Sequence, residues 1–297
     1  MTSEATTATT AVVVSARIGV KRRESALKKL LRNRVTLAGL VVVVAVTLAA
    51  VLAPVLAPYS YDTVSVKEKL LEPSARQWLG TDQFGRDILS RILYGAQVSL
   101  VVGVAGMFVA LAAGVAIGAA AGYYGGWLDE ALMRSMDVIM AFPYIVLGVA
   151  MAAVVGPSFQ NLIFIIGVIR VPQFARITRG AVLSIRSADF VEAARCLGQR
   201  PTIILVKHIL PNCITPVVVL ASLSVATAIS AEAALSFLGL GVQPPMASWG
   251  TMLADGRQYM YNAPWIATFP GLAISITILG YNLFGDGLRD VLDPRLR

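Results

Sequence analysis

The sequence predicts an all-α membrane protein with six transmembrane helices. Of its 297 residues, 57% are hydrophobic and only 14% are charged, against about 25% charged in an ordinary soluble domain. Its mean hydropathy is +0.72. This apolar content excludes a disordered chain. It also excludes a single soluble domain, because so much apolar sequence would leave large patches exposed to water.

Uncharged stretches long enough to cross a bilayer recur along the chain. A spanning helix needs about 20 mostly apolar residues. The first stretch loses its apolar character before Pro58, and the second has its apolar core at residues 98–121. These two stretches, and four that follow, predict spans at about residues 35–56, 98–121, 137–155, 159–178, 212–235 and 265–284.

The third and fourth spans are predicted from one uncharged stretch that is too long for a single helix. Gly156-Pro157-Ser158 divides it and indicates a tight turn. Arg170 and Pro172 lie near the predicted end of the fourth span, and the fifth span is expected to begin after Pro211. The sixth has its core from Trp265 to Phe284.

The distribution of basic residues predicts that both termini are cytoplasmic. With the N-terminus inside, 19 of the 25 lysines and arginines fall on the cytoplasmic side, as the positive-inside rule requires. The main outer loop, residues 58–96, carries five basic and five acidic residues and is nearly neutral. The net charge of +8 is therefore an orientation signal, and no nucleic-acid partner is expected.

Residues 1–34 are predicted to be a cytoplasmic tail, and residues 35–297 the membrane domain. The first 20 residues are rich in Ser, Thr and Ala and look disordered. They do not form a signal peptide, because basic residues separate them from an apolar run that is too long. Residues 24–34 are either a short basic amphipathic helix on the inner leaflet or a solvated stop before the first span.

The chain lacks the common catalytic and metal-binding motifs. It has no CxxC, HExxH, GxSxG or GxxxxGK[ST] sequence, so it is not expected to hydrolyse ATP through a phosphate loop. Cys196 and Cys213 are too few for a disulfide framework. No carboxylate pair joins them and His208 at the spacing of metal ligands. We therefore predict no catalytic residue, no metal site and no cofactor in this chain.

Two acids and three glycines within the spans are candidates for special roles. Asp137 and Glu232 are candidates for the pathway or its gate, because intramembrane acids are rare and functional. Arg134 offers Asp137 a local partner, which favours a structural role for Asp137, whereas for Glu232 both roles remain open. A stripe of small residues in the second span predicts close helix packing, namely Gly114, Gly118 and Gly122.

The segment between the fourth and fifth spans, residues 187–212, predicts a helix–turn–helix that protrudes into the cytoplasm. Gly198 fits a helix end, Pro201 fits the first turn of a second helix, and Pro211 is expected to break the chain before the fifth span. One face of the first helix carries Phe190, Ala193, Ala194 and Leu197. Such a protrusion suits docking into a groove on a soluble partner.

These residues resemble a known motif. The sequence Glu192-Ala193-Ala194, followed by Gly198 and Leu210-Pro211, resembles the EAA loop of ABC importer permeases. His208 stands where that family usually has isoleucine. The resemblance implies the type I ABC importer permease fold. It also implies that the loop forms the coupling helix that seats in a cleft of the ATPase subunit.

Three further stretches resemble the second permease of dipeptide, oligopeptide and nickel importers, over about residues 25–297. They are residues 79–100, 232–250 and 282–295. Around Thr81-Asp82 and Gly85 the residues also predict turns and a helix cap. Residues 237–249 contain too many glycines and prolines for one straight helix, so they predict an ordered outer loop, which serves as scaffold or contacts a binding protein.

The resemblance implies half of a translocation pathway for di- or oligopeptides in the plasma (inner) membrane, with nickel or another chelated solute as the alternative cargo. The implied partners are a homologous second permease, two ATPase subunits that bind ATP and magnesium, an extracytoplasmic binding protein and membrane lipid. A membrane-embedded enzyme is disfavoured because no catalytic cluster is present. An ion-coupled carrier would need buried ionisable residues midway through spans, and none is predicted there.

Overall fold

A computed structural model describes residues 33–292. Residues 1–32, which include most of the predicted amphipathic segment and nearly all of the N-terminal tail, lie outside this range. Within it, the secondary structure is helical apart from an isolated β-bridge between Thr81 and Asp87. The helices are α2 (Arg34–Val51), α3 (Ala53–Leu56), η1 (Val66–Glu68), α4 (Ile88–Tyr124), α5 (Gly126–Met140), α6 (Tyr144–Val155), α7 (Phe159–Ile185), α8 (Asp189–Cys196), α9 (Pro201–Ile203), η2 (Ile204–Ile209), η3 (Leu210–Cys213), α10 (Ile214–Phe237), α11 (Trp249–Gly256), η4 (Arg257–Tyr259) and α12 (Trp265–Leu292).

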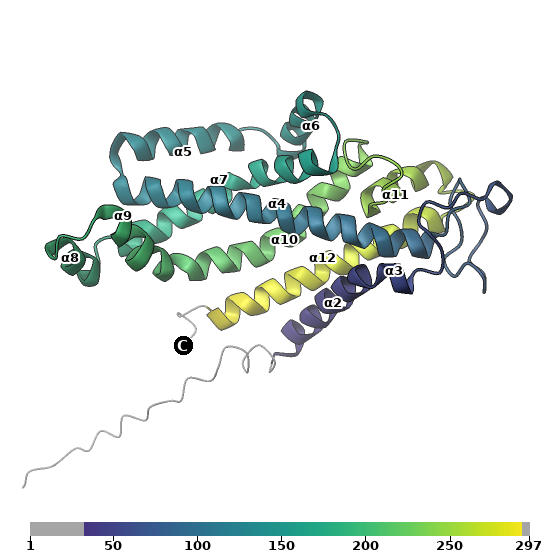
Figure 1. The fold of residues 1–297 in the computed structure, drawn as a ribbon, viewed down its shortest axis with the longest axis horizontal. Helices are drawn as coiled ribbons and strands as arrows, with labels where there is room; N and C mark the ends of the chain where they lie inside the picture. The colour runs from purple at the N-terminus through teal and green to yellow at the C-terminus, as the bar shows by residue number, and fades with distance from the viewer. Residues whose placement is uncertain (1–32, 293–297) are drawn as a thin grey trace, which may run out of the picture.

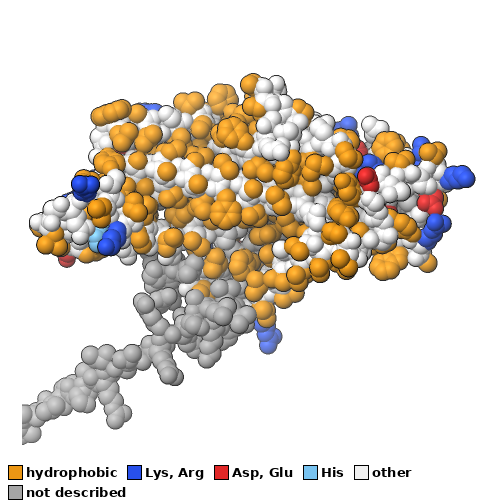
Figure 2. Space-filling view, viewed as in Figure 1, with side chains coloured by type: hydrophobic (Ala, Val, Ile, Leu, Met, Phe, Trp, Pro, Cys, Tyr) orange, Lys and Arg blue, Asp and Glu red, His pale blue; other side chains and the backbone are white. Residues whose placement is uncertain are grey.

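The long helices form an elongated bundle. Figure 1 shows α4, α7, α10, α12 and α2 running along its length, with α8 and α9 at one end and α11 and the segment before α4 at the other. A buried cluster joins Leu100 of α4, Phe174 of α7, Ile229 of α10 and Trp249 of α11. The space-filling view shows hydrophobic side chains over the flanks and most charged ones near the two ends (Figure 2). This distribution suits a bundle that crosses a membrane along its long axis.

The predicted fold class is confirmed. Five helical stretches are long and apolar enough to cross a membrane, and a bent pair brings the number to six if it counts as one span. That pair is α5 and α6, which meet at 93°. The predicted span over residues 137–155 is therefore interrupted between α5 and α6. Pro143, which caps α6, has no N–H to donate and disfavours helical geometry in the residue before it.

The prediction that Pro211 breaks the chain was wrong. Residues 201–237 form one continuous helical stretch that changes type on the way, from the π-helix η2 to the 3-10 helix η3 and then to α10. The missing N–H of Pro211 is accommodated by this change of winding. The side-chain amide of Asn212 donates a 2.7 Å hydrogen bond to the carbonyl oxygen of His208.

Candidate functional site

At one end of the bundle the chain forms the short helix α8, turns at a glycine and begins a second helix, α9 (Figure 1). Val191 and Ala194, one turn apart on α8, are buried in a cluster with Val182 of α7 and Ile204 of η2. Gly198 ends the turn with φ +71°, a conformation that is cheap for glycine. One side of α8 is therefore fixed to both α7 and the helical stretch that continues into α10.

The opposite side of α8 faces outward. Phe190 and Leu197 are 46% and 79% exposed, and Glu192 and Ala193 are exposed between them. Ala194, which was predicted to belong to this face, points inward instead and is 4% exposed. It lies three residues after the buried Val191, which is the spacing of one helix face. An apolar and small-residue surface remains available to a partner.

Polar contacts hold the turn in place. His208 Nε2 and Gln199 Oε1 are 2.9 Å apart, which ties the turn to η2. Arg195 Nη1 lies 3.2 Å from Glu192 Oε2, and its Nη2 donates to the carbonyl oxygen of Arg186. Leu210 is partly buried against the same cluster as Ala194, whereas Pro211 is exposed. The residues quoted for the EAA loop are thus brought together at one end of the molecule.

The glycine stripe lies against α7. A Cβ atom on Gly114 or Gly118 would clash with Phe174 or the carbonyl oxygen of Ala175, and one on Gly122 would lie 2.9 Å from the carbonyl oxygen of Arg179. The backbones of α4 and α7 therefore approach each other so closely that only glycine, which has no Cβ atom, fits at these positions.

Two ion pairs join α5 to α7. Arg179 contacts Asp129 through two 2.6 Å hydrogen bonds, and Arg176 Nη2 lies 2.6 Å from Asp137 Oδ1. Arg134 was available as a local partner for Asp137, but the partner that the fold supplies, Arg176, comes from another helix. Asp137 is therefore placed in a helix–helix contact.

Glu232 is completely buried. Its carboxylate accepts hydrogen bonds from Ser99 of α4 at 2.9 Å and from Ser236 of α10 at 2.7 Å. The Ser99 oxygen also accepts from the backbone N–H of Trp249 at 3.3 Å. The structure therefore places Glu232 at a buried joint between three helices.

A charged cluster at the α11 end was not predicted. Asp82 accepts hydrogen bonds from the backbone N–H groups of Phe84 and Arg86 and lies 2.6 Å from Arg86 Nε. Arg86 and Arg91 also approach Asp255 of α11, at 3.7 and 3.9 Å. Burial raises the pKa of the Asp255 carboxyl, although both arginines oppose the shift. The i,i+4 spacing of Asp82 and Arg86 was the sequence signal that could have predicted this ion pair. The turns and helix cap expected in this loop are present.

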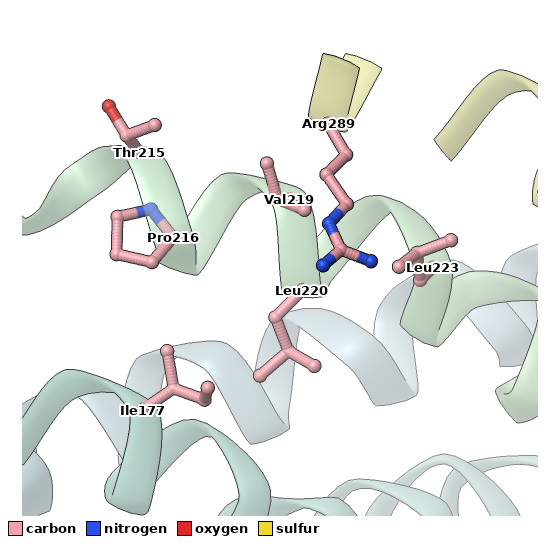
Figure 3. A pocket seen from close by; sticks show the side chains of 7 residues that line it. All are labelled: Ile177, Thr215, Pro216, Val219, Leu220, Leu223 and Arg289. Carbon is pink, nitrogen blue, oxygen red and sulfur yellow. The ribbon is translucent and has the colours of Figure 1, made fainter. Parts of the chain in front are cut away.

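A cleft of about 380 Å³ opens between α7, α10 and α12. Figure 3 shows Arg289 reaching from α12 toward Val219 and Leu223 of α10, with Ile177 of α7 on the other wall. Asp286 and Asp290 on the same helix are exposed.

Comparison with known families decides the identity. The family model described as binding-protein-dependent transport system inner membrane component matches residues 114–297. The chain belongs to this family. The N-terminal transmembrane domain of oligopeptide transport permease C matches residues 23–73 of the permease.

Relatives cover most of the permease. It is 45% identical to the dipeptide transport system permease protein of Alkalihalophilus pseudofirmus, over 92% of its own length and 90% of the relative's. It is 41% identical to a glutathione transport system permease protein of Pectobacterium atrosepticum, over 91% and 90% of the two chains. It is therefore an inner-membrane permease component of an ABC importer.

A solved structure shows the same fold. The permease resembles a chain of the methionine ABC transporter MetNI, in an inward-facing crystal form, with a TM-score of 0.57 and 20% identity over 68% of the permease and 96% of that chain. The predicted type I importer fold is thereby confirmed.

Proposed function

We propose that this permease forms half of the translocation pathway of an ATP-driven importer of di- or oligopeptides. The relatives named for dipeptide and glutathione transport support a peptide cargo, and they favour it over nickel or another chelated solute. The other half is a homologous permease, and an extracytoplasmic binding protein delivers the peptide. ATP and magnesium bind to two partner ATPase subunits, and this chain has no ATPase site of its own.

We further propose that the exposed face of α8 seats in a cleft of an ATPase subunit. The observation that carries this proposal is the two-sidedness of α8. Its outer face offers Phe190, Ala193 and Leu197, while its inner face packs on Val182 and Ile204. A displacement of α8 must then move α7 and the stretch leading into α10 together, because packed side chains transmit shifts with little compression.

The proposed cycle follows from this coupling. ATP binding closes the ATPase pair and carries α8 with it, so that α7 and α10 shift from an inward-open to an outward-open arrangement. ATP drives this change only to the extent that it binds one arrangement more tightly than the other. Glu192 and Gly198 keep the helix and its turn in the shape that the cleft accepts.

The test is Leu197→Asp in the assembled importer. Leu197 is 79% exposed, so the substitution leaves the fold intact while placing a charge in the proposed interface. We expect at least a tenfold loss of peptide-stimulated ATPase activity and loss of ATPase co-purification, an estimate of about 1.4 kcal/mol or more in binding. Val66→Asp, at an apolar position in η1 that is 72% exposed, is the matched control and must retain the ATPase. Full coupling in Leu197→Asp would refute the docking role.

A further inference from the structure

Helix α7 carries three arginines between its middle and its C-terminal end. One of them lacks an acidic partner among residues 33–292. Arg176 and Arg179 are paired with Asp137 and Asp129 of α5. The third, Arg170, contacts only neutral acceptors there. Its Nη1 donates to Gln173 Oε1 at 3.3 Å, and its Nη2 donates to the backbone carbonyl oxygen of Thr227 in α10 at 3.4 Å.

Arg170 lies near the middle of its helix. The sequence placed it close to the end of the fourth span, but α7 continues to Ile185. At 1.5 Å per residue, Arg170 is about 17 Å from the first residue of α7, and the apolar core of a bilayer is about 30 Å thick. An arginine at mid-depth is costly and is almost always found facing a bundle interior or a water-filled cavity. Its presence therefore calls for a group that compensates its charge.

The surroundings of Arg170 are polar and open. Its guanidinium carbon lies 5.9 Å from the ring centroid of Tyr144, which is the first residue of α6 and follows the break at Pro143. Tyr144 is 44% exposed, and Gln173 and Thr227 are also exposed. The Nε atom of Arg170 is buried without a hydrogen-bond partner in the described structure. The arginine thus combines an uncompensated charge with an accessible face.

An apolar cavity of about 600 Å³ has Ile145, the residue after Tyr144, in its wall. It begins beside Phe237 and Leu238 at the end of α10. A solute that entered at the α11 end would pass Arg257, whose guanidinium carbon lies 5.5 Å from the ring centroid of Phe237, and would then follow this apolar surface. That arrangement suits a ligand with apolar side chains and one negative group.

We propose that Arg170 binds the carboxylate of an imported peptide part-way across the membrane. This inference rests on the proposed peptide-import function and names the group that the permease recognises. A guanidinium binds a carboxylate through two parallel hydrogen bonds. The bound carboxylate would supply the negative charge that no described residue supplies, and the hydroxyl of Tyr144 and the amide of Gln173 can donate further hydrogen bonds. A free divalent metal ion would be repelled at the same position.

The test compares two peptides that differ only in a C-terminal carboxylate or carboxamide. Uptake is measured in the full importer reconstituted in vesicles, with each peptide supplied as saturating loaded binding protein, so that differences in delivery do not contribute. We expect the wild type to prefer the acid, and Arg170→Gln to reduce acid uptake at least about tenfold with little effect on the amide. Arg170→Lys keeps the positive charge but cannot form the two parallel hydrogen bonds of a guanidinium, so its preference for the acid should lie between those of the wild type and Arg170→Gln. Basal ATPase activity reports assembly of each variant.

Arg176→Gln is the matched control, because it removes an already paired arginine from the same helix. It should alter uptake of both peptides alike. An acid preference that persists in Arg170→Gln and Arg170→Lys, an equal loss of both peptides, or a wild type without any preference would each overturn the carboxylate role while leaving peptide import standing. A wild-type importer that moves neither peptide would instead refute the proposed function, and the inference with it.

Discussion

Ser99 of α4 donates a 2.9 Å hydrogen bond to Glu232 of α10 across 133 residues of sequence. The same serine oxygen accepts the N–H of Trp249, the first residue of α11. A single buried carboxylate and a single hydroxyl therefore join three helices at the end of the bundle opposite α8.

The joint predicts distinct outcomes for two substitutions of Glu232. Glu232→Gln keeps the length and one carbonyl acceptor, so we expect only a small loss of stability. Glu232→Ala leaves the hydroxyls of Ser99 and Ser236 without their acceptor and creates a cavity, which together should cost about 2–4 kcal/mol. Thermal denaturation of the purified importer measures both. Equal midpoints for Glu232→Ala and the wild type would show that the joint contributes nothing.

The pair Asp129–Arg179 gives a prediction about the bent α5–α6 segment. Two 2.6 Å hydrogen bonds in a fork geometry are stronger than a typical surface ion pair. We expect Asp129→Asn and Arg179→Gln each to destabilise the importer. In a double-mutant cycle the coupling energy should be about 1–2 kcal/mol, measured from denaturation midpoints. Additive losses would mean that the two side chains act independently.

Hydropathy was enough to locate five helical stretches, because each is a long apolar run whose helical backbone satisfies its own hydrogen bonds. It failed at α5 and α6, since Pro143 lies within an equally apolar run and hydropathy does not register a missing N–H. The bend became visible only in the backbone.

The length of α7 was underestimated for a different reason. The fourth span was predicted to end soon after Arg170 and Pro172, because unpaired charges such as those of Arg176 and Arg179 do not belong within a membrane. Their partners, Asp137 and Asp129, lie 39 and 50 residues earlier in the sequence, so the compensation could not be read from the local sequence. The same error hid the depth of Arg170. Similarly, the small-residue face of α8 was predicted from helical periodicity. Which side of α8 is buried depends on its packing against Val182 of α7 and Ile204 of η2, which the local sequence does not show.

The glycine stripe on α4 leads to the last prediction, which concerns Gly118 and uses Gly180 of α7 as its control. A Cβ atom on Gly118 would clash with the carbonyl oxygen of Ala175 and lie 2.9 Å from the Cβ of Thr178. Since backbone cannot yield without separating α4 from α7, Gly118→Ala should destabilise the importer by about 1–3 kcal/mol.

Gly180 on α7 has open space where its Cβ would be. Gly180→Ala should therefore be neutral or stabilising by up to about 1 kcal/mol, because alanine loses less backbone entropy in a helix. The same glycine-to-alanine substitution should therefore lower the denaturation midpoint at Gly118 and leave it unchanged or raise it at Gly180. A loss of similar size in both variants would mean that helix propensity or lipid contact, and not the α4–α7 approach, determines the effect at Gly118.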